Sequence, residues 1–149
     1  MPKKPTSADA QLVLQLYDLR RETEMRKARA WWAGFWPASA DDVVKVVNSF
    51  GTPENAWFRQ VAGYWGTAAS LVLSGALNEE LFAETNGEMW FTFSKVSPFI
   101  DEVRQKLNRP ESFLRVEKLA KKTKAGRELL KGMEKQFASR RQAAAGKSS

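Results

Sequence analysis

Residues 52–77 read TPENAWFRQVAGYWGTAASLVLSGAL, and this stretch decides the fold because it is apolar around most of its circumference. Thr52 is a favourable N-cap, and Pro53 follows at the first helical position, where its missing N–H removes no hydrogen bond. Gly75 stands where a helix can end in a left-handed residue. The stretch therefore predicts a helix over residues 53–74.

Two apolar stripes run along this predicted helix. The stripes comprise Trp57, Val61, Trp65, Ala68 and Val72 on one side, and Phe58, Tyr64, Leu71 and Gly75 on the other. A helix with two apolar stripes needs neighbours on more than one side. We therefore predict an all-α, single-domain bundle of six or seven helices packed around a buried central helix.

The size and composition of the chain fit one domain. Its 149 residues are 43% hydrophobic and 28% charged, which is ordinary for a globular domain. We expect a flexible lead over residues 1–7, a helical domain over residues 8–138 and a flexible basic tail over residues 139–149. No apolar run approaches the roughly 20 residues that span a bilayer, and no apolar segment follows the N-terminal lysines. The expected location is the cytoplasm.

The segments beside the central helix also carry helical patterns. Residues 8–36 predict one long helix, which ends before Pro37. Residues 39–48 predict a short valine-rich helix. Residues 88–107 keep helical spacing, and Pro98 leaves open whether they form one kinked helix or two.

The chain contains no histidine and no cysteine. This removes the commonest general acid/base and the commonest transition-metal ligands. We therefore expect no enzyme, no cofactor and no metal site. Glu80, Glu84 and Glu88 recur at four-residue intervals, but a di-iron bundle site would also need histidine. A solvated acidic surface is the simpler interpretation.

The chain is rich in aromatic residues, with six Trp and nine Phe. Most of them follow helix stripes, which favours a structural core over an apolar ligand pocket or a partner groove. Trp31 and Trp32 are adjacent, however, and point about 100° apart on a helix. Both are buried only if this helix end is wrapped on two sides or meets another chain. The candidate interaction residues are therefore Trp31, Trp32, Phe35 and Trp36.

Positive charge is concentrated in the C-terminal third. Residues 1–103 carry a net charge of −3, whereas residues 104–149 carry +10. A basic patch there could hold a phosphate backbone, although a solvated charged face is the favoured interpretation. The candidate phosphate or nucleic-acid contacts are Lys118, Lys121, Lys122, Lys124 and Arg127. For Arg59, on the central helix, an ion pair or a surface position is favoured over an anion site.

Three segments carry a resemblance to a known family. DAQLVLQLYDLRRETEMRKARAWW, PENAWFRQVAGYWGTAASLVLSGALNEELFAETNGEMWF and AGRELLKGMEK resemble a family of small, all-helical bacterial proteins of unknown function. The resemblance covers residues 8–141. It implies a compact helical domain in a bacterial cytoplasm, and it implies no activity, cofactor or catalytic residue.

Three functions remain open at this point. The leading hypothesis is a non-enzymatic interaction or adaptor protein, which binds an unknown protein partner or forms a homo-oligomer. The alternative is a nucleic-acid-associated protein that uses the basic C-terminal helices. The third is a small-ligand binder with an aromatic pocket.

Overall fold

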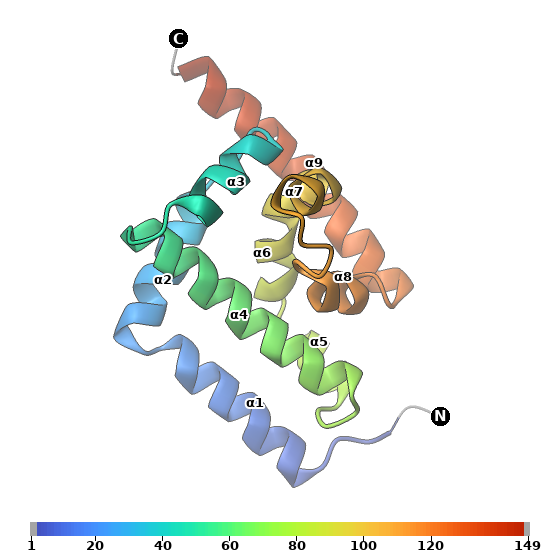
Figure 1. Ribbon diagram of the computed structural model, residues 1–149. Coiled ribbons are helices and arrows are strands. Elements are labelled where there is room, and N and C mark those ends of the chain that lie inside the picture. Colours follow the sequence, from blue (N-terminus) through green and yellow to red (C-terminus); the bar gives the residue numbers. More distant parts are fainter. Residues whose placement is uncertain (1–2, 148–149) are drawn as a thin grey trace.

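The computed structural model describes residues 3–147 of the chain, and within this part helices joined by loops form the whole fold, with no strand (Figure 1). The all-α prediction is therefore confirmed. The α-helices are α1 (Ser7–Arg20), α2 (Thr23–Gly34), α3 (Ala40–Asn48), α4 (Pro53–Leu73), α5 (Glu79–Thr85), α6 (Glu88–Val96), α7 (Ile100–Leu107), α8 (Leu114–Ala120) and α9 (Lys124–Lys147), and the 3-10 helix η1 (Ser97–Phe99) lies between α6 and α7.

The structure contains more helices than the six or seven expected, because two long helical patterns are divided. The pattern over residues 8–36 breaks after Arg20, where the side chain of Glu22 accepts hydrogen bonds from the backbone N–H groups of Glu24 and Met25. Glu22 thus caps a new helix, α2. These two hydrogen bonds lower the pKa of the Glu22 carboxyl. One long first helix was a wrong expectation.

The second division falls at Pro98, where the sequence left one kinked helix or two open. Helix α6 ends at Val96, η1 contains Pro98, and α7 follows from Ile100. Proline has no N–H to continue the hydrogen-bonding ladder of α6, and it is well accepted in the first turn of the next helix.

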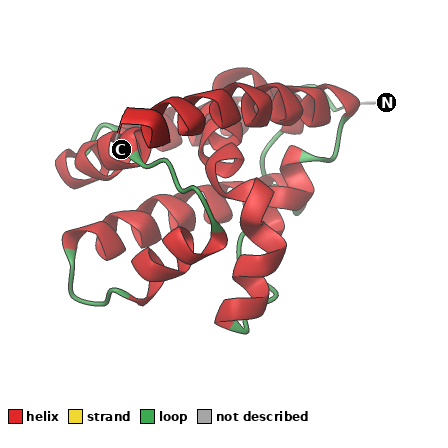
Figure 2. Ribbon diagram, turned by 90° about the horizontal axis from the view of Figure 1, so that it is seen from above, coloured by secondary structure: helices red, strands yellow, loops and turns green. Residues whose placement is uncertain are grey.

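The central position of α4 is confirmed. The Thr52 side chain accepts a hydrogen bond from the Asn55 N–H, and Pro53 occupies the first turn. Gly75 has a φ of 85°, in the left-handed region where only glycine is free of strain. Helix α4 packs against α2, α3, α5 and α8, and the loops that join these helices are short (Figure 2).

Internal hydrogen bonds and helical structure extend into both ends of the chain. The carbonyl of Lys3 accepts a hydrogen bond from the Asn78 side chain, and Thr6 caps α1. Helix α9 continues to Lys147, so residues 139–147 of the expected tail are helical; residues 1, 2, 148 and 149 of the expected lead and tail lie outside the described residues. Within the described residues, no helix is both long and apolar enough to cross a membrane.

Candidate binding groove

The outward face of α4 lines an open groove between the α3–α4 turn and the segment from α7 to α8. We call it the α4 groove. Its volume is about 560 Å³, which lies within the range of binding pockets. Its lining consists of Val47, Phe50, Phe58, Arg59, Ala62, Gly63, Gly66, Thr67, Ser70, Val103, Leu107, Arg109, Glu111, Ser112, Phe113, Leu114, Arg115 and Val116.

Small residues form the floor of the groove. Ala62, Gly63, Gly66, Thr67 and Ser70 follow one another along the same face of α4. A Cβ atom added at Gly63 or at Gly66 would meet no other heavy atom within 4 Å. Glycine in a helix interior costs about 1 kcal/mol relative to alanine, so two open glycines here are not explained by tight packing within the chain.

Two large apolar side chains stand on opposite rims. Phe50, in the α3–α4 turn, is 70% exposed, and Leu114, at the start of α8, is 38% exposed. The next residue after Phe50, Gly51, has a φ of 88°, so the turn needs a residue without a Cβ. The rims therefore present apolar surface on both sides of the small-residue floor.

Arg59 is held in place by a buried amide. Asn55 is fully buried, and its Nδ2 donates to the carbonyls of Val46 and Val47 at the C-terminal end of α3, at 3.0 and 2.9 Å. The Oδ1 of the same amide accepts a hydrogen bond from Arg59 Nε at 3.0 Å. The Asn55 side chain thus donates to free carbonyls at the end of α3 and also fixes the guanidinium of Arg59 at the groove.

The opposite wall is fixed by Arg104. Its Nε donates to the carbonyl of Ser112 at 2.9 Å, and its guanidinium pairs with Glu117 at 3.0 Å. Burial acts to raise the pKa of Glu117, but hydrogen bonds from Lys121 and Arg104 outweigh it, and the net pKa is lowered. The connection between α7 and α8 is therefore anchored to α7 and α8 by one side chain.

Phe113 makes the wall turn sharply. Its φ is 57°, a left-handed conformation that is unusual and strained for a bulky residue. Its ring packs edge-on against Phe58, with centroids 5.9 Å apart, and lies 6.2 Å from the centroid of Phe93. Packing of the ring therefore offsets the backbone strain and sets the direction in which Leu114 and Arg115 leave the turn.

The charged lining residues are mostly cationic. Arg59, Arg109 and Arg115 line the groove together with one acid, Glu111. Among the described residues, none of these four side chains forms an ion pair within 4.0 Å. The sequence favoured an ion pair or a surface position for Arg59, and the structure shows an exposed guanidinium bonded only to an amide.

The aromatic residues predicted to meet a partner lie mainly against one another. Trp32 is 1% exposed and stacks on Phe58 at 4.9 Å, while Trp31 stacks on Phe35 at 4.6 Å. Trp36 packs edge-on against Phe137 at 5.1 Å. Helices α4 and α9 thus contribute rings to this helix end, while Trp31 is only partly buried. Contact of these aromatic residues with a partner stays a prediction.

A buried lysine in the same region escaped the sequence analysis. Lys95 has no exposed surface, and its Nζ donates to the carbonyls of Trp32, Ala33 and Phe35 at 2.7, 3.2 and 2.8 Å. The ammonium lies 3.7 Å from the ring centroid of Trp36. Burial lowers the pKa of Lys95 to about 7. We call this arrangement the Lys95 cage, and it closes the C-terminal end of α2.

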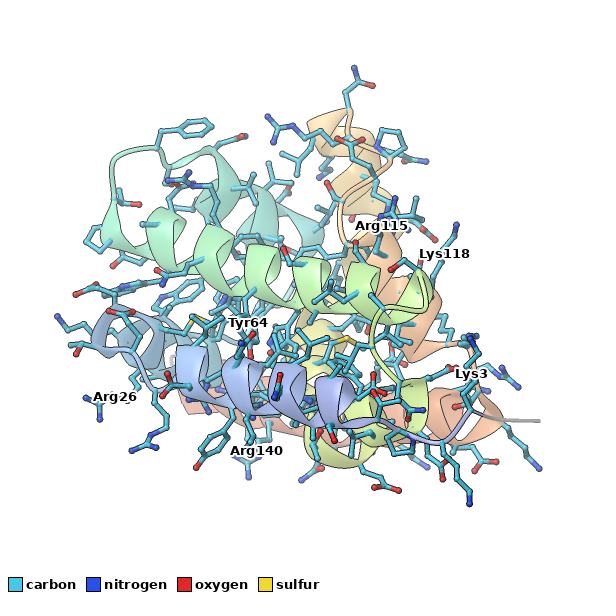
Figure 3. All side chains as sticks on the ribbon, turned by 90° about the horizontal axis from the view of Figure 1, so that it is seen from below. Lys3, Arg26, Tyr64, Arg115, Lys118 and Arg140 are labelled. Atoms are coloured by element: carbon cyan, nitrogen blue, oxygen red, sulfur yellow. The ribbon has the colours of Figure 1, made fainter. Side chains whose placement is uncertain are left out.

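The predicted nucleic-acid contacts gather where α8 meets α9, but most of them have internal partners. Lys121 pairs with Glu117, Lys122 with Glu79 and Lys124 with Glu128, while Arg127 donates to the carbonyls of Lys121 and Lys122. Lys118 is exposed and leaves α8 on the same side of the molecule as Arg115 (Figure 3). Binding of nucleic acid at this corner stays a prediction.

The acidic residues on α5 and α6 do not converge. Glu88 pairs with Arg29 at 2.8 Å, and this bond raises the pKa of the guanidinium. Glu80 and Glu84 are exposed. Among the residues that the structure describes, no group of three acidic side chains could hold a metal ion.

Fold and site together define a class: an all-helical domain with an open, apolar groove bordered by arginines. A family model described as a domain of unknown function (DUF4760) matches residues 5–123, and the chain belongs to this family. The expected membership in a family of unknown function is thereby confirmed. The match includes every lining residue of the α4 groove and ends directly before α9. No curated protein and no solved structure matches the chain.

Proposed function

We propose that this protein is a non-enzymatic interaction protein that binds a helical segment of a partner protein in the α4 groove. The observation that carries this proposal is the open floor of Gly63 and Gly66 between two exposed apolar rims, Phe50 and Leu114. Exposed apolar surface that is arranged around a hollow is typical of a binding site.

The shape of the groove favours a helix as the occupant. Its floor runs from Arg59 to Ser70, which is about 16 Å along a helix axis. About three turns of a second helix match this length. Small residues allow two helix backbones to approach closely, and large apolar side chains on either rim then cover the sides of the guest helix. Docking of an amphipathic helix into an apolar groove is a recurring mode of protein recognition.

Selection of peptides tests this proposal. A displayed library of 14-residue helical peptides is panned against the purified protein, and binders are then measured against Gly66→Leu, which fills the floor. The matched control is Gly132→Leu on α9, where an added Cβ also meets no atom within 4 Å. The expected result is binding that Gly66→Leu weakens at least tenfold and Gly132→Leu leaves unchanged.

Two outcomes would overturn the proposal. In the first, the library yields no binder that Gly66→Leu weakens. In the second, light scattering shows that the protein forms a dimer that Gly66→Leu dissociates, in which case a second copy occupies the groove and not a partner.

A further inference from the structure

We infer that the partner helix carries acidic residues beside its apolar stripe, and that Arg59 at one end of the floor and Arg109 and Arg115 on the wall formed by the α7–α8 segment bind these acids. This inference rests on the proposed function and adds the chemistry of the partner to it. The strongest support is the distribution of cations around the α4 groove.

The cations come from two parts of the groove. Arg59 belongs to α4, where it begins the floor, whereas Arg109 lies in the connection between α7 and α8 and Arg115 lies on α8. A helix lying along the floor would therefore meet one guanidinium group near its end and two along the α7–α8 wall. Glu111 is the one acid in the described lining, so the groove carries an excess of two positive charges over its rims.

Two other arginines of the described chain form structural ion pairs. Arg29 pairs with Glu88 at 2.8 Å, and Arg104 pairs with Glu117 at 3.0 Å. The first pair joins α2 to α6 and the second joins the consecutive helices α7 and α8, so both help to hold the fold. Arg59, Arg109 and Arg115 form no such pair within the described residues, so their charge is available to a ligand.

Arg59 is also prepared for binding. Its Nε is committed to Asn55 Oδ1 at 3.0 Å, and Asn55 is fully buried and bonded to α3. The two terminal nitrogens of the guanidinium accordingly remain for a ligand, and the amide reduces the freedom that Arg59 loses on binding. Guanidinium and carboxylate groups form paired hydrogen bonds of matching geometry.

The apolar part of the partner follows from the same lining. Gly63 and Gly66 leave room above the floor for apolar side chains of moderate size, while Phe50 and Leu114 contact the flanks of the stripe. The sequence pattern expected in the partner is an apolar residue at every third or fourth position, with Asp or Glu directly beside this stripe.

The test uses the peptides selected for binding that Gly66→Leu weakens. We expect Asp and Glu to be enriched at the positions that flank the apolar stripe, relative to the unselected library. We also expect Arg59→Gln and Arg115→Gln each to weaken the binding of such a peptide about fivefold, as a partly exposed ion pair would. The control is Arg26→Gln, because Figure 3 shows Arg26 at one end of the molecule, well away from Arg115.

A second measurement separates charge from damage to the fold. The selected peptide is resynthesised with Gln in place of each Glu and Asn in place of each Asp, and its affinity is measured at 50 and 500 mM salt. The affinity of the acidic peptide should fall as the salt concentration rises, and the affinity of the neutral peptide should not.

Two results would overturn this inference and leave the proposed function standing. In the first, peptides whose binding Gly66→Leu weakens show no enrichment of Asp and Glu. In the second, such a peptide binds wild type and Arg59→Gln with equal affinity. If no groove-dependent peptide is selected at all, the proposed function itself fails.

Discussion

The Lys95 cage and the α4 groove both place a cation beside apolar residues, and they differ in what that cation touches. The ammonium of Lys95 donates to three carbonyls and lies under the ring of Trp36. Arg59 has one internal hydrogen bond, to Asn55, and no acidic partner within the described chain. A lysine ammonium has three donors, so Lys95 is satisfied internally.

A similar contrast separates a glycine at the junction of α8 and α9 from a glycine of the α4 groove. Gly126 lies where α9 meets the end of α8, and an added Cβ would stand 2.5 Å from the carbonyl oxygen of Ala120 and 3.3 Å from Trp90 Nε1. At Gly66 an added Cβ would meet nothing. The comparison shows that one side of this small protein is closed by its own chain, whereas the other is left open.

The largest expected effect on stability is the difference between truncating Lys95 and truncating Arg59. Lys95→Ala leaves a cavity and removes the lysine donor from three carbonyls, and should lower the free energy of unfolding by about 3 kcal/mol. Arg59→Ala should lower it by no more than about 0.5 kcal/mol, as for an exposed residue. Urea unfolding at pH 7 gives both values. Equal losses in the two variants would contradict the distinction between closed and open regions.

A smaller loss is expected when Gly126 becomes alanine. The new Cβ would push against the Ala120 carbonyl, which also accepts the hydrogen bond of Trp90 Nε1 at 3.1 Å. Overpacking of this kind costs about 1–3 kcal/mol. Thermal unfolding followed by circular dichroism measures it, and a melting temperature at or above that of wild type would show that the junction of α8 and α9 is not closed.

The pH dependence of stability provides a second test of the Lys95 cage. The pKa of Lys95 is lowered from 10.5 to about 7 in the folded protein. Between these values the unfolded chain binds a proton that the folded chain does not, so the free energy of unfolding should rise with pH, by at most about 1.4 kcal/mol per pH unit. Below pH 7 this contribution is constant.

The rise should be absent in Lys95→Met, which serves as the control for other titrating groups. Tyr64 affects stability only above pH 10. Burial raises its pKa from 10.0 to about 12, so its contribution to the free energy of unfolding falls as the pH rises above 10. Parallel profiles for wild type and Lys95→Met between pH 7 and 10 would show that the pKa of Lys95 is not lowered.

The smallest expected effect is a gain. Gly66→Ala should raise the free energy of unfolding by about 0.5–1 kcal/mol, because alanine loses less entropy in a helix and its methyl group meets no neighbour. Chemical unfolding measures the gain. A loss of stability in this variant would mean that the floor of the groove is not open.

Much of the fold is predictable from local signals. Thr52, Pro53 and Gly75 mark the bounds of α4, and Pro98 marks the division between α6 and α7. The break at Glu22 was missed because its N-cap is a glutamate, which is less common there than Ser, Thr, Asp or Asn.

The groove was not predicted, although part of its signal is present in the sequence. The spacing of Gly63, Gly66 and Ser70 shows a small-residue face on the central helix. The other wall comes from residues more than thirty positions later, and no local pattern brings Arg115 beside Arg59. Lys95 was detectable in principle, since it is the one charged residue in the largely apolar run from Trp90 to Val96.

The most direct test of the account is an NMR titration of the isotope-labelled protein with a selected peptide. The account predicts that the largest amide shifts occur along α4 at Gly63, Gly66 and Thr67, and across the groove at Leu114 and Arg115. Shifts that map instead to the exposed face of α1, around Leu14 and Tyr17, with the amides of Gly63 and Gly66 unchanged, would contradict the claim that the α4 groove is the binding site.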